Sequence, residues 1–184
     1  MSPHLLNADV SQLLIVDMQT RLMSVMPPEA LAACINNTGV LAQAAKLLAV
    51  PVVVTEQYPK GLGPTDPAVL AHLAGTVPVA KIAFSCLAEA KVRRQFSRDR
   101  SQIVLAGMEA HICILQTALD LIATGKQVCV AEDAIISRNA ANKANAIARM
   151  RDAGCMISNT ESIVFEWLGK AEGDAFKTIS KLIR

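Results

Sequence analysis

Aromatic side chains and net charge are both scarce in this sequence. Its 184 residues include only four Phe, one Tyr and one Trp, so the core must consist mainly of aliphatic side chains. The 18 Lys and Arg nearly balance the 16 Asp and Glu, which gives a net charge of +2. We therefore expect no nucleic-acid partner, because such partners need a strongly basic stripe. Apolar residues make up 52% of the chain, a fraction that excludes intrinsic disorder.

Paired cysteine motifs and long apolar runs are also lacking. The cysteines are odd in number and form no CxxC motif, which argues against a disulfide framework or a zinc site. The first residues lack the pattern of a secretory or transit signal, and no apolar run approaches the roughly 20 residues of a membrane span. We therefore expect a cytoplasmic protein with reduced thiols and no membrane partner. The five cysteines are Cys34, Cys86, Cys113, Cys129 and Cys155.

Short aliphatic runs alternate with longer helical segments along the whole chain. Runs that are apolar on both faces are typical of buried parallel strands. Their alternation with helices predicts one doubly wound α/β domain over residues 1–184, with a mainly parallel sheet and helices on both faces. We expect strands at 13–16, 52–54, 77–80, 103–105, 128–130 and 155–158, and helices at 29–49, 67–73, 87–97, 110–124, 139–153, 161–168 and 175–183.

Three polar residues follow or end the aliphatic runs, where an open α/β sheet binds its ligands. Asp17 follows the first run, Lys81 ends the segment VPVAK, and Cys113 lies six residues after Gly107, at the start of a predicted helix. A helix N-terminus and a nearby ammonium both favour a thiolate, so we expect a lowered pKa for Cys113. A nearby carboxylate could take the thiol proton and later deliver it to a leaving group.

Each of these residues also has a purely structural interpretation. Asp17 could cap the turn after its strand, Lys81 could be an ordinary surface lysine, and Cys113 could be a small core residue. The other four cysteines lie in apolar stretches and are assigned to the core. Ser85 is expected to cap a helix. The histidines are dispersed, which favours surface or packing roles over a metal site or a catalytic base; they are His4, His72 and His111.

Three motifs in order resemble the isochorismatase-like cysteine hydrolase superfamily: LLIVDMQ (13–19), VPVAKIAFSCL (77–87) and IVLAGMEAHICILQTALDL (103–121). The resemblance runs from about residue 13 to 168. It implies a three-layer, Rossmann-like α/β/α fold with strand order 3-2-1-4-5-6, and homo-oligomers. The family's catalytic Asp, Lys and Cys match Asp17, Lys81 and Cys113. The resemblance also implies a cis peptide between Met108 and Glu109, with the backbone N–H groups of Glu109 and Cys113 forming an oxyanion hole.

The loop after the second predicted strand departs from one branch of the family. Nicotinamidases carry an Asp-x-His metal motif there, but this chain has Gln57 and Pro59 at those positions. We therefore expect no metal and no cofactor. Pocket walls are expected from this loop and its neighbours, with loop packing as the alternative for each residue. These residues are Gln19, Gln57, Tyr58 and Phe84.

The resemblance implies a metal-independent cysteine hydrolase that cleaves a small amide C–N bond through a thioester on Cys113. True isochorismatases cleave a vinyl ether without a cysteine, so the presence of Cys113 favours acyl transfer. Two alternatives remain open: a non-catalytic interaction or scaffold protein that keeps the fold, and a thiol redox sensor at Cys113.

Overall fold

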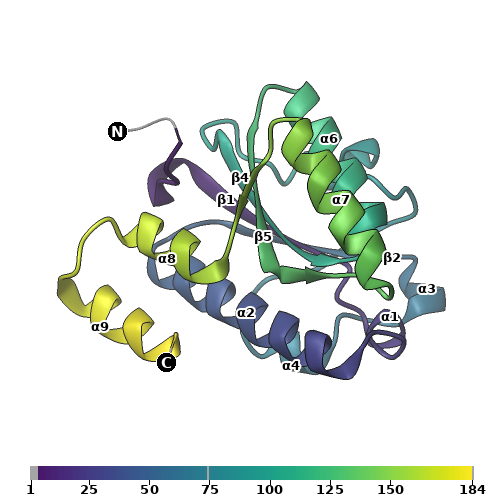
Figure 1. Cartoon of the computed structure of the whole chain (residues 1–184), viewed down its shortest axis with the longest axis horizontal. Coiled ribbons are helices and arrows are strands. Elements are labelled where there is room, and N and C mark those ends of the chain that lie inside the picture. The colour runs from purple at the N-terminus through teal and green to yellow at the C-terminus, as the bar shows by residue number, and fades with distance from the viewer. Residues whose placement is uncertain (1–3, 74, 184) are drawn as a thin grey trace.

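The computed structural model describes residues 4–73 and 75–183 and contains a six-stranded sheet between two layers of helices (Figure 1). All neighbouring strands pair in parallel, and their order is β3-β2-β1-β4-β5-β6. The predicted strand order is confirmed, and the sheet is wholly rather than mainly parallel. The strands are β1 (Ser11–Val16), β2 (Val52–Gln57), β3 (Val79–Lys81), β4 (Gln102–Met108), β5 (Gln127–Ile136) and β6 (Met156–Ser158).

The two central strands carry the hydrophobic core. Every residue of β1 and β4 is buried, as expected for strands covered on both faces. Successive side chains point to opposite faces, so Leu13 and Ile15 join one apolar cluster while Leu14 and Val16 join the other. The first cluster lies under α2, α8 and α9, and the second under α6 and α7, which cover opposite faces in Figure 1. The helical segments are η1 (Ala8–Val10), α1 (Thr20–Met23), α2 (Pro28–Leu47), α3 (Pro59–Leu62), α4 (Pro67–Leu70), η2 (Cys86–Ala88), α5 (Ala90–Arg93), η3 (Ala110–Ile114), α6 (Leu115–Ala123), α7 (Ala140–Asp152), α8 (Thr160–Leu168) and α9 (Gly173–Leu182).

Several predicted segments differ in detail from the structure. The helix expected at 87–97 is divided into η2 and α5, because Glu89 between them is extended. Ser85 caps η2, as predicted, by accepting a hydrogen bond from the Leu87 N–H. The helix expected at 110–124 begins with the π-helical turn η3, and β5 continues past the predicted run to Ile136 through a bulge. Single-turn helices such as α1 and α3 were not predicted, since four residues give too short a pattern to detect.

The ends of β1 and β4 approach each other unusually closely. Gly107 has a φ of 113°, and a Cβ atom there would lie 2.1 Å from the carbonyl oxygen of Val16. Only glycine fits this backbone and this space. The peptide bond between Met108 and Glu109, which follows directly, is cis. The close approach brings the segment after β1 beside the turn that leads from β4 into η3.

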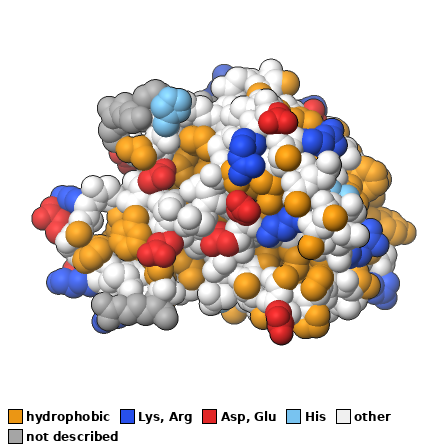
Figure 2. All heavy atoms as spheres, viewed as in Figure 1, with side chains coloured by type: hydrophobic (Ala, Val, Ile, Leu, Met, Phe, Trp, Pro, Cys, Tyr) orange, Lys and Arg blue, Asp and Glu red, His pale blue; other side chains and the backbone are white. Residues whose placement is uncertain are grey.

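Acidic and basic side chains are interspersed on the face of the molecule that Figure 2 shows. Among the described residues, no helix has both the length and the apolar character needed to cross a membrane.

Candidate active site

Asp17 and Lys81 meet beyond the carboxyl ends of the strands. Asp17 directly follows β1 with a φ of 53°, and Lys81 is the last residue of β3, two strands away. The long lysine side chain crosses β2 and places Nζ 2.7 Å from Oδ2 of Asp17. Neither side chain has any exposed surface. The surface interpretation of Lys81 and the simple cap interpretation of Asp17 are therefore wrong.

The Lys81 ammonium is held by four oxygen atoms. Besides Asp17, it donates to Oε1 of Gln57 at 2.6 Å and to the backbone carbonyls of Ala83 and Phe84 at 3.2 Å each. Burial lowers the pKa of Lys81, but the Asp17 carboxylate outweighs it, so that the pKa lies above its usual value. Lys81 therefore remains charged at neutral pH and serves as a fixed cation, not as a base.

Asp17 has a second partner, on β2. The Thr55 hydroxyl donates to Oδ1 of Asp17 at 2.7 Å, and the Thr55 carbonyl accepts from the Asp17 N–H at 3.1 Å. The sequence analysis did not single out Thr55. The available signal was its position near the carboxyl end of the strand beside β1.

The Cys113 thiol lies close enough to this ion pair for both charges to affect its pKa. Cys113 is only 6% exposed. Burial, with the Asp17 charge next in importance, raises its pKa to about 12, and the nearby Lys81 ammonium offsets only part of this. The expectation of a lowered thiol pKa is wrong, because desolvation and the carboxylate outweigh the cation. Cys113 is therefore a neutral thiol at pH 7 and needs a base before it can act as a nucleophile.

The turn before Cys113 is fixed by a second ion pair. The Glu109 carboxylate accepts from the Arg138 backbone N–H at 2.9 Å and from the Arg138 Nε at 3.0 Å. The Glu109 side chain is 6% exposed and that of Arg138 is 57% exposed. This contact joins the end of β4 to the segment that follows β5. From the sequence, Glu109 was expected to act only through its backbone, and Arg138 was not predicted.

The four residues predicted to line a pocket fall into two pairs. Gln19 is fully buried, and its amide donates to the carbonyls of Gln57 and Gly63 while its oxygen accepts from the Gln57 N–H. Gln57 in turn holds Lys81 and donates to the carbonyl of Ile82. These two side chains support the site from within the protein. Tyr58 and Phe84 are instead about half exposed, at 51% and 54%, on the segments next to Gln57 and Lys81.

The other cysteines and the histidines take the roles expected of them. Every cysteine is unpaired and buried. Cys86 also lies near the site, where its sulfur is 3.9 Å from the Thr55 hydroxyl oxygen. His111 pairs through Nδ1 with the Ser137 hydroxyl at 3.0 Å. Within residues 4–73 and 75–183, no group of three or more His, Cys, Asp or Glu side chains is arranged to hold a metal ion.

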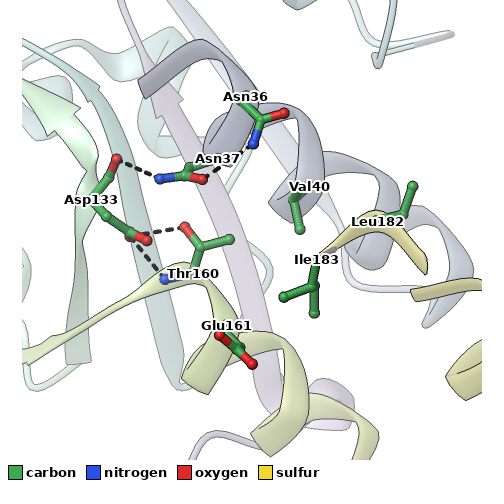
Figure 3. Close-up of a pocket in the computed structure, with 8 residues that line it drawn as sticks. All are labelled: Asn36, Asn37, Val40, Asp133, Thr160, Glu161, Leu182 and Ile183. Atoms are coloured by element: carbon green, nitrogen blue, oxygen red, sulfur yellow. Dashed lines mark hydrogen bonds between the residues drawn. The ribbon is translucent and has the colours of Figure 1, made fainter. Parts of the chain in front are cut away.

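A cavity of about 330 Å³ lies elsewhere, among α2, β5, α8 and α9 (Figure 3). Several of its polar groups already bind one another: Asn37 donates to the Asp133 carbonyl, and the Thr160 N–H and hydroxyl donate to the Asp133 carboxylate. These contacts fasten α2 and the start of α8 to β5. None of the three converging side chains lines this cavity, so its size does not make it the reaction centre.

A doubly wound parallel sheet with an acid, an ammonium and a thiol gathered at its carboxyl edge is the arrangement expected of isochorismatase-like hydrolases. Comparison with known proteins agrees, since the sequence model of the isochorismatase domain matches residues 11–162. The chain belongs to the isochorismatase family and shares its hydrolase fold.

Relatives and solved structures match over most of the chain. Isochorismatase domain-containing protein 2 of Bos taurus is 36% identical over 95% of this chain and 83% of its own length. The secreted isochorismatase effector Isc1 of Phytophthora sojae is 39% identical over 84% and 76%. The MAR1 ribonuclease of Caenorhabditis elegans superposes with a TM-score of 0.90 and 33% identity, over 97% of this chain and 91% of that one. YcaC of Escherichia coli, described as an octameric hydrolase of unknown specificity, gives a TM-score of 0.89 at 22% identity over 99% and 92%, a likeness of fold alone.

Proposed function

We propose that the protein is a metal-independent cysteine hydrolase that cleaves a small amide C–N bond through a thioester on Cys113. The observation that carries this proposal is the buried Asp17–Lys81 pair, 2.7 Å apart, within the reach of a neutral thiol. A buried carboxylate fixed by an ammonium beside a thiol is suited to moving one proton between the thiol and a substrate.

The reaction begins with transfer of the Cys113 thiol proton to Asp17 as the sulfur attacks the carbonyl carbon. The N–H groups of Glu109 and Cys113 stabilise the oxyanion that forms. Asp17 then gives its proton to the nitrogen of the leaving amine as the C–N bond breaks, which leaves a thioester. A water molecule loses a proton to Asp17 and attacks the thioester. That proton returns to the sulfur, and a carboxylic acid leaves. Lys81 stays charged throughout.

The raised thiol pKa explains why a base must act during the attack. With a pKa of about 12, release of the thiol proton to water at pH 7 costs on the order of 7 kcal/mol. Transfer to Asp17 avoids much of this cost, because it also removes the carboxylate charge that disfavours the thiolate. Proton transfer and attack are therefore coupled.

The decisive experiment is a screen of small amides, ureas and carbamoyl compounds against the wild type and Cys113→Ala. Circular dichroism must show that the variant folds. The proposal expects turnover of at least one compound by the wild type and none by the variant. Equal turnover by both proteins would contradict it, and folded wild type that is inert throughout would favour the scaffold alternative.

RNA cleavage is a second candidate, favoured by the likeness to the worm protein named a ribonuclease. The net charge of +2 speaks against an extended contact with phosphates. Incubation of the same two proteins with labelled single-stranded RNA separates the two activities. Cleavage that requires Cys113 would favour this candidate over amide hydrolysis.

We further propose that the chain forms a homo-oligomer. Large apolar side chains are strongly exposed in the single chain: Ile82 at 66% and Phe84 at 54%, directly after Lys81, and Val77 at 81%, before the start of β3. Exposed apolar groups of this kind commonly mark a protein interface. Light scattering should give a dimer or larger, and Ile82→Glu should reduce its size.

A cytoplasmic location is also proposed, supported by the five unpaired thiols, which suit a reducing compartment. The secreted relative in Phytophthora makes this worth testing directly. Fractionation of cells that express the tagged chain should recover it inside the cell and not in the medium.

A further inference from the structure

We infer that Thr55 is a positioning residue, and that through it the two carboxylate oxygens of Asp17 have different roles in proton transfer. The Thr55 hydroxyl holds Oδ1, so the proton from Cys113 goes to Oδ2. This inference rests on the proposed function and assigns a further residue to it.

Thr55 forms two hydrogen bonds with Asp17. It is fully buried in β2, two residues before the strand ends, and its hydroxyl lies 2.7 Å from Oδ1. Its carbonyl also accepts the Asp17 backbone N–H at 3.1 Å. Asp17 has a positive φ, a conformation that a non-glycine residue keeps only where its surroundings impose it. Thr55 thus fixes both the backbone and the side chain of the base.

A third residue contacts the Thr55 hydroxyl. The Cys86 sulfur lies 3.9 Å from the Thr55 oxygen and donates to it. Burial raises the pKa of Cys86 to about 11, so its sulfur keeps a proton to donate. A hydroxyl has one proton, and with Cys86 as the donor to its oxygen, that proton is available to Oδ1.

The second oxygen of Asp17 is arranged differently. Its partner is the Lys81 ammonium, whose Nζ lies 2.7 Å from Oδ2. Lys81 keeps three other acceptors, on Gln57, Ala83 and Phe84, when Oδ2 takes a proton. Oδ1 keeps its hydrogen bond from the Thr55 hydroxyl, so a proton delivered to Oδ2 leaves that contact undisturbed. The titratable groups that face Asp17 are Lys81 from β3, Cys113 from η3 and Cys86 from η2.

The test follows the rate of Cys113 alkylation by iodoacetamide against pH, with the modified peptide identified by mass spectrometry. In the wild type the rate should fall toward acid pH with a measurable midpoint. Thr55→Val removes the hydrogen bond that favours the charged carboxylate, so the acid midpoint should rise by about one pH unit. Thr55→Ser keeps the hydroxyl and should restore the wild-type midpoint.

Thr117→Val is the matched control, because the Thr117 hydroxyl is also buried and accepts from the Cys86 N–H without touching Asp17. General damage to the core would lower the rate at every pH without moving the midpoint. A wild-type midpoint in Thr55→Val overturns the inference, and Thr55→Ala carries the same test if the valine variant does not fold. Cys113 that stays unmodified at every pH in the wild type would instead overturn the proposed function, and the inference with it.

Discussion

The Lys81 ammonium lies 2.7 Å from the Asp17 carboxylate with both side chains fully removed from water, although one follows β1 and the other ends β3. Moving two charges out of water is costly, and only their mutual attraction and further hydrogen bonds compensate. Thr55, Gln57 and two backbone carbonyls supply those hydrogen bonds. The fold therefore maintains a charged pair that contributes little to net stability but is suited to proton transfer.

Removing one member of this pair should destabilise the protein more than removing both charges. Lys81→Met leaves the Asp17 charge buried without its partner, and we expect a loss of about 3–5 kcal/mol in the free energy of unfolding. Adding Asp17→Asn to Lys81→Met removes the stranded charge and should recover much of that loss. Urea unfolding of the two single variants and the double variant gives the coupling energy. Losses that simply add in the double variant would show that the two charges do not interact.

Gln57 should matter because its oxygen accepts from the Lys81 ammonium. Gln57→Leu removes that acceptor, and a hydrogen bond to a charged group contributes about 1.5 kcal/mol or more. We expect Cys113 alkylation at pH 8 to slow about tenfold. Gln43→Leu is the control, since Gln43 donates to the Gly39 carbonyl within α2. The prediction fails if the two variants react at the same rate.

Gly107→Ala should be far more damaging than Gly125→Ala, although both glycines have a positive φ. A Cβ at Gly107 would lie 2.1 Å from the Val16 carbonyl oxygen, whereas one at Gly125 meets nothing within 4 Å. We expect Gly125→Ala to cost about 1 kcal/mol and Gly107→Ala about 3 kcal/mol or more. Thermal unfolding of both variants measures this, and equal losses would mean that β1 and β4 can separate without cost.

The buried thiols should make the protein less stable in alkali. The pKa of Cys113, Cys34 and Cys129 is raised by burial from 9.0 to about 12, and that of Cys86 and Cys155 to about 11. Below pH 9 the thiols keep their protons in both the folded and the unfolded chain. Above it the unfolded chain releases protons that the folded chain retains, so the free energy of unfolding falls by up to about 1.4 kcal/mol per thiol and pH unit.

Urea unfolding in reducing buffer at pH 8, 9 and 10 checks this dependence. Cys129→Ala, which lacks one of the raised thiols, should show a shallower fall with pH than the wild type. Stability that stays constant or rises from pH 8 to 10 would contradict the prediction.

The strands of the sheet and their order were predicted from two different sources. Runs that are apolar on both faces mark buried strands, and the resemblance to a known family gives their order, which the structure confirms. Since parallel strands end at one edge, Asp17, Lys81 and Cys113 were expected to converge there, and the structure brings them together. Their catalytic roles remain a prediction.

The surroundings of the site could not be predicted in the same way. Thr55 and Arg138 act through contacts with residues far away in the chain, and neither carries a local pattern that marks it. The direction of the Cys113 pKa shift was predicted wrongly. The positions of the charged residues could be expected from the strand ends, but the depth at which the sulfur is buried could not. The supporting roles of Gln19 and Gln57 also depend on contacts that the sequence does not show.

The most direct measurement compares Cys113 with Cys155 under limited alkylation at pH 7.5. The two thiols are almost equally exposed, at 6% and 5%, and Cys113 has the higher pKa of the pair, about 12 against about 11. Access and acidity alone would therefore make Cys155 react at least as fast. If Asp17 takes the thiol proton, Cys113 is modified first. Asp17→Asn abolishes its lead, because the loss of the base outweighs the lower thiol pKa that follows from removing the carboxylate charge. Modification of Cys155 ahead of Cys113 in the wild type, or an unchanged Cys113 rate in folded Asp17→Asn, would contradict the account.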